Sequence, residues 1–261
     1  MTLVYLYAVA PAASRRWLAA EPLRGIGDLP VRAVSEGDVA GIVSDVPASE
    51  FDQEPLDRNV ADASWLGPRA AAHQDVNARI LAGLGSVLPL AFGTLFRGDD
   101  GVREALRSRA AELFEALERL GGRAEWVITV DRDRDAALAA LDDEPRLASL
   151  VRDVSAAAPG RAYLLRRSLE DARTALLRER DAEARAALRD ALAPVATDLT
   201  DEPLIEGGPI ARVTALASRD QTAVGGALDR FGAEWGPRGY TPRLSGPWPP
   251  YRYAAKLGSL R

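Results

Sequence analysis

The sequence contains no cysteine and only one histidine, one methionine and one lysine among its 261 residues. The lack of cysteine excludes disulfides, thiolate metal sites and cysteine nucleophiles. The single histidine, His73, is too few for a conventional zinc site. No apolar stretch reaches the roughly 18 residues that a membrane-spanning helix needs. We therefore expect a chain without metal, cofactor or disulfide that does not enter a membrane.

The chain also has no excess of positive charge: 38 acidic residues outnumber 33 basic ones, the formal net charge is −5 and the pI is about 5.2. This balance provides no overall field that would attract nucleic acid or anionic lipid. Hydrophobic residues make up 47% and charged residues 27% of the chain, which is the composition of a folded protein rather than a disordered one. We expect a cytoplasmic protein that does not bind nucleic acid.

The N-terminal residues 1–13 superficially resemble a signal peptide, but they lack its positively charged first segment. Apolar side chains occupy both alternating sets of positions from Leu3 to Val9. This pattern predicts a strand with both faces buried rather than a targeting segment.

The first half of the chain predicts a compact α/β domain over residues 1–121. Glu36-Gly37-Asp38 separates two short apolar runs and predicts a β-hairpin, because glycine supplies the positive φ of a tight turn. The other elements expected are a loop at 47–55, a helix at 56–84 interrupted near Gly67-Pro68, a strand at 87–96 and an amphipathic helix at 101–120.

The second half predicts a ferredoxin-like domain over residues 122–261 that carries a long extra helix. Its first strand, 125–130, is apolar on both faces and should be central in its sheet. The remaining elements expected are a helix at 135–157, a long helix at 162–193, strands at 210–217 and 240–244, and a helix at 222–235. Residues 178–185 are almost all charged, so we expect the long helix either to protrude there or to break in two, and we favour protrusion.

A search for catalytic and ligand-binding patterns yields no catalytic, cofactor or metal residue. His73 follows Arg69 by one helical turn and is expected to make structural hydrogen bonds. The glycine pair at 207–208 lacks the lysine of a phosphate-binding loop. The alternating aspartates at 131, 133 and 135 lack the glycine and glutamate of a calcium loop, and the acidic residues 142–144 are adjacent in a loop-like context beside a proline. We therefore expect the protein not to be an enzyme.

The C-terminal run Gly246-Pro247-Trp248-Pro249-Pro250-Tyr251-Arg252-Tyr253-Ala254 interleaves three prolines with three aromatic residues. Proline fixes φ and removes a backbone donor, so the run predicts a stiff extended segment, here called the C-terminal arm. Its rings Trp248, Tyr251 and Tyr253 either cap the chain's own core or form a binding surface for a partner. We name these three residues as the candidate partner-binding site.

Five segments, in this order, are similar to those of the GvpL/GvpF family of gas vesicle proteins: Tyr5-Leu6-Tyr7, Arg69-x-x-x-His73, Val87–Phe96, Glu125–Val130 and Gly246–Tyr251 of the C-terminal arm. The resemblance implies an α+β protein of two α/β domains, the first a modified and the second a regular ferredoxin-like fold. It implies a non-enzymatic accessory or minor structural protein of the gas vesicle that is required for assembly. By the same resemblance, its partners are the hydrophobic main shell protein and other gas vesicle proteins, and its location is the gas-facing side of the shell.

Two other classes of function deserve comparison. A ferredoxin-like protein that binds a small regulatory ligand needs a pocket with convergent polar groups, and the sequence offers no such lining. A protein that binds nucleic acid on the same sheet needs basic residues next to exposed aromatic ones. The neighbour of Trp126 is instead acidic, Glu125, which argues against this class. The ligand-binding protein is the alternative that we retain beside gas vesicle assembly.

Overall fold

The computed structural model describes residues 2–141 and 144–258. Their contacts divide the chain into two compact units. Unit 1 comprises residues 2–125 together with 247–258, and unit 2 comprises residues 126–246. The sequence predicts the C-terminal arm as part of the second domain. In the structure, residues from 247 onward instead belong to unit 1, where Tyr251 contacts Asn77.

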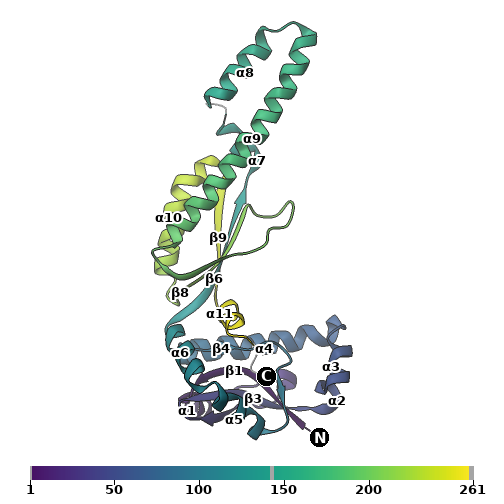
Figure 1. Cartoon of the computed structure of the whole chain (residues 1–261), viewed down its shortest axis with the longest axis vertical. Helices are drawn as coiled ribbons and strands as arrows, with labels where there is room; N and C mark the ends of the chain where they lie inside the picture. The colour runs from purple at the N-terminus through teal and green to yellow at the C-terminus, as the bar shows by residue number, and fades with distance from the viewer. Residues whose placement is uncertain (1, 142–143, 259–261) are drawn as a thin grey trace. The chain divides into compact units, whose positions relative to one another are not determined.

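Unit 1 is an antiparallel sheet covered on both faces by helices (Figure 1). Its elements are β1 (Thr2–Pro11), α1 (Ser14–Ala20), the 3-10 turn η1 (Ile26–Asp28), β2 (Arg32–Glu36), β3 (Val39–Pro47), α2 (Ala48–Phe51), α3 (Gln53–Asn59), α4 (Ala63–Leu84), β4 (Leu88–Pro89), β5 (Leu95–Phe96), α5 (Asp99–Ser108), α6 (Ala110–Leu120) and α11 (Tyr251–Lys256). The strand order is β2-β3-β1-β4, and β5 also pairs with β1. With α1 and α4 as its connections, this is the ferredoxin-like order.

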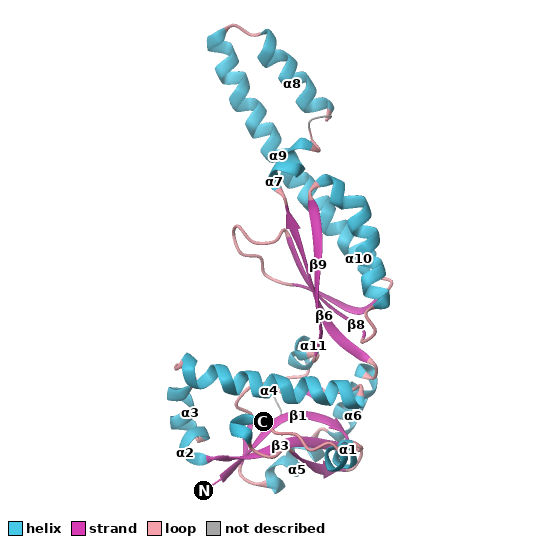
Figure 2. Cartoon of the chain, turned by 180° about the vertical axis from the view of Figure 1, so that it is seen from behind, coloured by secondary structure: helices cyan, strands magenta, loops and turns pink. Residues whose placement is uncertain are grey.

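The central strand β1 is buried from Leu3 to Ala10, as the double apolar pattern predicted. One face carries Tyr5 and Tyr7, which pack in the same core as residues of α4 such as Ile80. On the other face lie α5 and α6, as Figure 2 shows for α5. Burial on both faces explains why the strand has almost no polar side chain.

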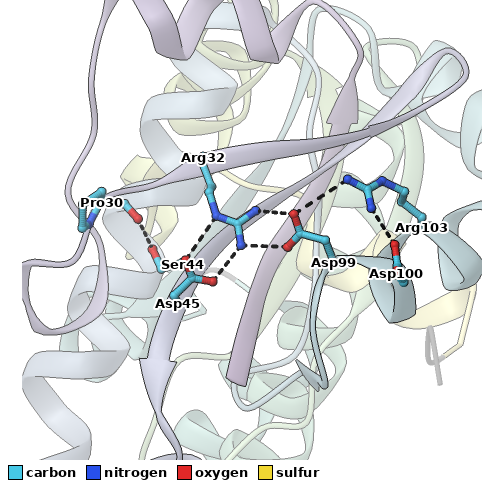
Figure 3. A network of polar contacts seen from close by, with 7 residues as sticks. All are labelled: Pro30, Arg32, Ser44, Asp45, Asp99, Asp100 and Arg103. Atoms are coloured by element: carbon cyan, nitrogen blue, oxygen red, sulfur yellow. Dashed lines mark hydrogen bonds and ion pairs between the residues drawn. The ribbon is translucent and has the colours of Figure 1, made fainter. Parts of the chain in front are cut away.

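The edge strand β2 is attached to the rest of unit 1 by a polar network (Figure 3). The guanidinium of Arg32 binds the carboxylate of Asp45 on β3 at 2.7 Å and that of Asp99 at the start of α5 at 2.8 Å. Asp99 also lies 3.8 Å from Arg103, one turn further along α5. The two bidentate pairs fix α5 against the hairpin more specifically than apolar contacts alone.

Unit 2 contains the second sheet, with the strand order β7-β8-β6-β9. Its elements are β6 (Arg123–Arg132, which begins in unit 1), α7 (Arg134–Ala139), α8 (Pro145–Ala156), α9 (Pro159–Leu192), β7 (Ala196–Asp201), β8 (Ala211–Ser218), α10 (Thr222–Trp235), the 3-10 turn η2 (Gly236–Arg238) and β9 (Tyr240–Trp248). Because β8 lies between β6 and β7, the path β6-α9-β7-β8-α10-β9 is the split βαβ arrangement of ferredoxin-like folds. The α+β class and the central position of β6 are as predicted, and the long helix is α9, the first crossover helix of this arrangement.

The helix α9 is continuous, and its charged middle does not protrude as predicted, because one face of it packs on the sheet while most of its other side chains are exposed. Asp181 is 8% exposed, and Ala184 is completely buried. Asp181 accepts a hydrogen bond from the hydroxyl of Tyr240 at 2.8 Å and pairs with Arg132 on the central strand. The N-terminal half of α9 instead runs beside α8, beyond the end of the sheet (Figures 1 and 2).

Other expectations from the sequence were also wrong in detail. The helix expected at 135–157 is divided into α7 and α8. The loop expected at 47–55 contains α2 and the start of α3, and the strand β7 was not predicted. The strand expected at 87–96 consists of two separate two-residue strands, and the helix expected at 101–120 is divided at Arg109. The helix α4 begins at Ala63 and continues through Pro68. Residues 142 and 143, the first two of the acidic loop, lie outside the described residues.

Candidate functional site

The segments singled out in the sequence of unit 1 meet around His73 of α4. This side chain is 5% exposed. The centroid of its ring lies 5.8 Å from that of Tyr5, 5.7 Å from Tyr7, 5.9 Å from Phe92 and 6.2 Å from Tyr251. Four segments that are remote in sequence thus contribute one aromatic cluster, here called the His73 cluster.

Hydrogen bonds order the rings of the His73 cluster. Nδ1 of His73 lies 2.9 Å from the hydroxyl of Tyr5, and Nε2 lies 3.1 Å from Nδ2 of Asn77. Nδ2 of Asn77 also donates to the hydroxyl of Tyr251 at 3.0 Å. Nδ2 of Asn77 also lies 3.1 Å from the backbone carbonyl oxygen of His73. A polar chain therefore connects β1, α4 and α11.

Burial keeps this chain uncharged. It lowers the pKa of His73 to about 4, against a small opposing effect of the Leu90 backbone. Burial likewise raises the pKa of Tyr251 to about 12 and raises the pKa of Tyr5. A general base needs a pKa near the working pH. These groups do not titrate near neutral pH, so the His73 cluster has the properties of a structural anchor rather than of an acid–base site.

The segment Leu88–Thr94 wraps the backbone of β1 beside this cluster. The amide of Leu90 donates to the carbonyl of Tyr7 at 2.9 Å, and the amide of Leu6 donates to the carbonyl of Thr94 at 2.9 Å. Between them Gly93 has a φ of 82° and donates its amide to the hydroxyl of Tyr5 at 3.2 Å. A residue with a side chain rarely adopts this φ, which explains the glycine in the segment.

Arg69 and His73 are one helical turn apart, but Arg69 makes its contacts elsewhere. Its guanidinium binds Oε2 of Glu50 at 2.6 Å and stacks over the ring of Trp65 at 4.3 Å. The indole nitrogen of Trp65 donates to the same carboxylate oxygen at 3.1 Å. This arrangement attaches α2 to α4 and supports the wall of the His73 cluster.

The sequence predicts an extended C-terminal arm, but the arm is only partly extended. Strand β9 ends at Trp248, Pro249 and Pro250 are buried, and the helix α11 begins at Tyr251. Proline is tolerated immediately before and at the start of a helix because the first amides have no partner within the helix. The stiff Pro-Pro step therefore sets the start of α11 and directs Tyr251 to Asn77.

The three candidate residues of the arm occupy different environments. Tyr251 is held by Asn77, whereas the amide of Tyr253 donates to Oε1 of Glu125 at 2.8 Å. Burial raises the pKa of Glu125, although this hydrogen bond opposes the shift. Trp248 remains 40% exposed. Of the three rings, that of Trp248 is the most available to a partner.

An apolar groove of about 390 Å³ lies between α11 and the segment that follows β4. Its lining includes Leu90, Ala91, Tyr251, Ala254 and Ala255. We call it the C-terminal groove. Sequence reasoning missed its small residues and also Asn77, although Asn77 follows His73 at the i,i+4 spacing that marks a shared helix face.

Two observations limit the chemistry of the described residues. Within ranges 2–141 and 144–258, no group of three or more metal-ligating side chains lies together. In the same ranges, each helix is too short or too polar to span a bilayer.

Comparison with known proteins gives a consistent relationship. Residues 3–255 match the family model "Gas vesicle synthesis protein GvpL/GvpF". Gas vesicle protein F of Streptomyces sp. (strain CB03234) is 31% identical over 237 residues, which cover 89% of this chain and 92% of that protein. Gas vesicle protein L of the same strain is 38% identical over 147 residues, or 56% of this chain and 52% of that protein.

The fold is also similar to a solved one. The crystal structure of the gas vesicle protein GvpF from Anabaena sp. PCC7120 superposes with a TM-score of 0.71 and covers 97% of this chain and 98% of that one. The sequence identity of 17% means that this comparison concerns the fold. The match of the family model over nearly the whole chain and the relative that is 31% identical show that this protein belongs to the GvpL/GvpF family of gas vesicle synthesis proteins.

Proposed function

We propose that this protein is a non-enzymatic accessory or minor structural component of gas vesicle assembly that binds the hydrophobic main shell protein. The observation that carries the proposal is the anchoring of α11 on the His73 cluster, which leaves Trp248 40% exposed and forms the C-terminal groove. The segments that resemble the family are the ones that build this anchor. The binding site includes Trp248, Tyr251 and Tyr253, with Trp248 in contact with the partner and the two tyrosines holding α11.

The physical reason lies in the chemistry of a shell subunit. A very hydrophobic subunit aggregates unless its apolar surface is covered before it joins the wall. An exposed tryptophan and a groove lined by apolar and small side chains provide such cover without any reacting group. We place this activity on the gas-facing side of the growing shell, in keeping with the family, and no catalytic step is involved.

The proposal is tested by capturing the main shell protein with the purified full-length chain. Trp248→Ala should weaken capture by about tenfold or more, since buried tryptophans at interfaces contribute more than about 1.4 kcal/mol. Phe114→Ala is the matched control, because Phe114 is an aromatic residue of similar exposure, 45%, on α6. It should bind as the unmodified chain does.

The variant Tyr251→Ala separates the two roles of the arm. It should weaken capture by releasing α11 from Asn77, and protease cleavage at the C-terminus should increase in parallel. Full capture by a folded Trp248→Ala variant would overturn the binding site. No capture by the unmodified chain would overturn the proposed partner.

A further inference from the structure

The outer end of α9 carries an apolar and basic surface that nothing in the described residues covers. Tyr163 is 67% exposed and Leu164 is 64% exposed. Three exposed arginines, Arg161, Arg166 and Arg167, surround them, and none pairs with a carboxylate of the described residues. We call these five residues the basic end of α9.

The spacing of these residues places them together. Arg167 follows Tyr163 by four positions and Leu164 by three, so these three side chains share one face of the helix, and Arg161, three positions before Leu164, lies at the edge of that face. Residues 145–173 hold six arginines and three acidic residues, a formal charge of +3 in a chain whose net charge is −5. Many other arginines of this protein have acidic partners, as Arg173 has in Glu170. The basic end of α9 therefore matches a partner surface that is acidic and apolar.

Unit 1 contains such a surface beside α3. A groove of about 450 Å³ is lined by apolar residues that include Leu56, Val60 and Phe96 and by polar ones that include Asp52, Asp57 and Arg97. Residues 52–62, which contain α3, hold four carboxylates and one arginine, a formal charge of −3. We call this the acidic groove.

The carboxylates of the acidic groove are not neutralised by neighbouring arginines. Asp52 accepts from the amide of Gln53, and Asp57 accepts from its side chain at 3.2 Å. Among the described residues neither forms an ion pair, although Arg97 is one of the groove's lining residues. The volume lies within the range of about 300–1,000 Å³ typical of pockets that enclose small ligands. It is sufficient for the side chains of a tyrosine and a leucine.

We propose that the basic end of α9 of one molecule docks into the acidic groove of a second copy of this chain. Tyr163 and Leu164 would fill the apolar floor while the arginines meet Asp52 and Asp57. Opposite charges on the two surfaces steer and orient the encounter. Because two different surfaces meet, each copy retains one free basic end or one free groove, and the contact is of the head-to-tail kind that builds rings or open rows.

The test is sedimentation velocity of the full chain over a range of protein concentrations at low and high salt. The unmodified protein should associate with rising concentration, and high salt should weaken association because it screens the charges. Glu54 is the acidic residue in the first turn of α3, three positions before Asp57 on the same helix. Arg161→Glu with Arg167→Glu should reduce association by tenfold or more, and so should Glu54→Arg with Asp57→Arg. An equimolar mixture of these two double variants should associate again, since an acidic helix end then meets a basic groove.

Matched controls exclude effects of net charge and of folding. Arg15→Glu with Arg16→Glu on α1 makes the same charge change at exposed residues elsewhere and should leave association unchanged. Tyr163→Ser with Leu164→Ser should abolish association without changing charge. The proposal would be overturned if the unmodified chain stayed monomeric at all concentrations. It would also be overturned if either charge-reversed double variant associated as the unmodified chain does, or if the mixture of the two did not associate.

Discussion

The hydroxyl of Tyr251 accepts a hydrogen bond from Nδ2 of Asn77 at 3.0 Å, although 174 positions separate the two residues in the chain. This contact attaches α11 to α4 and thereby closes unit 1 around its buried histidine. The C-terminal arm thus acts as an internal anchor at Tyr251 and offers an exposed ring at Trp248. The cap on the core is thus seen at Tyr251, while a surface for a partner stays a prediction for Trp248.

Removing only the hydroxyl of Tyr251 tests the anchor. Tyr251→Phe leaves the buried amide of Asn77 with one acceptor fewer, and it should lower the free energy of unfolding by about 1 kcal/mol. Chemical denaturation measures the loss. Tyr163→Phe removes a hydroxyl from an exposed ring and is the control. Equal stability of the two variants would show that the Asn77 contact does not hold α11.

The pKa of His73 predicts a specific dependence of stability on pH. An imidazole titrates near pH 6.5 in the unfolded chain and at about 4 in the folded one, because burial disfavours its charged form. Above pH 6.5 the ring is neutral in both states, so its titration does not reduce the free energy of unfolding. Between pH 6.5 and 4 only the unfolded state binds the proton, so the free energy of unfolding falls by up to about 1.4 kcal/mol per pH unit as the pH falls.

The chain has one histidine, so a single imidazole resonance in the NMR spectrum reports this titration directly. It should show no midpoint between pH 5 and 8 while the protein is folded. His73→Gln should flatten the fall in stability below pH 6.5. A midpoint close to 6.5 in the folded protein would contradict the burial of His73 and its bonds to Tyr5 and Asn77.

The regular elements could be predicted where one residue pattern decided the structure. Apolar side chains on both faces made β1 and β6 identifiable as buried strands, and Gly37 with its positive φ of 57° marked the hairpin. The two prolines of the segment 47–55, Pro47 and Pro55, led to the incorrect prediction of a loop. Pro55 lies in the first turn of α3, where a missing amide costs nothing, and Asp52 caps that helix.

The site was harder to predict because its contacts are not local. The apolar run 87–96 gives no sign that Gly93 turns the chain, so that only its two ends pair with β1. Likewise, nothing in the charged run 178–185 indicates that Asp181 is the one charged residue of that run that is buried. No spacing rule connects Asn77 to Tyr251 or Asp181 to Tyr240, since these pairs form only after the chain has folded.

The buried carboxylate of Asp181 should be essential for the stability of unit 2. Asp181→Ala removes the partner of Arg132 and the acceptor of the Tyr240 hydroxyl, and it should cost about 3 kcal/mol. Asp190→Ala, at an exposed position of the same helix, should change stability by less than about 0.5 kcal/mol. Thermal unfolding monitored by circular dichroism compares the two. Similar melting temperatures would contradict the role of Asp181.

Two glycines three residues apart provide the last comparison. Gly239 has a φ of +84°, and a Cβ there would lie 2.7 Å from the amide nitrogen of Ala137 and 2.8 Å from the carbonyl oxygen of Asp133. These are backbone atoms of the β6–α7 junction, which the carbonyl of Gly239 also binds through the amide of Asp133 at 2.8 Å. Gly239→Ala should therefore destabilise the protein by about 2 kcal/mol or more, from the strained φ and the clash together.

Gly236 has helical angles and open space around its Cβ position, so Gly236→Ala should be neutral or stabilise the chain by up to about 1 kcal/mol. The difference between the two melting temperatures measures how closely the turn before β9 is packed against α7, and a Gly239→Ala variant as stable as Gly236→Ala would show that this packing is loose.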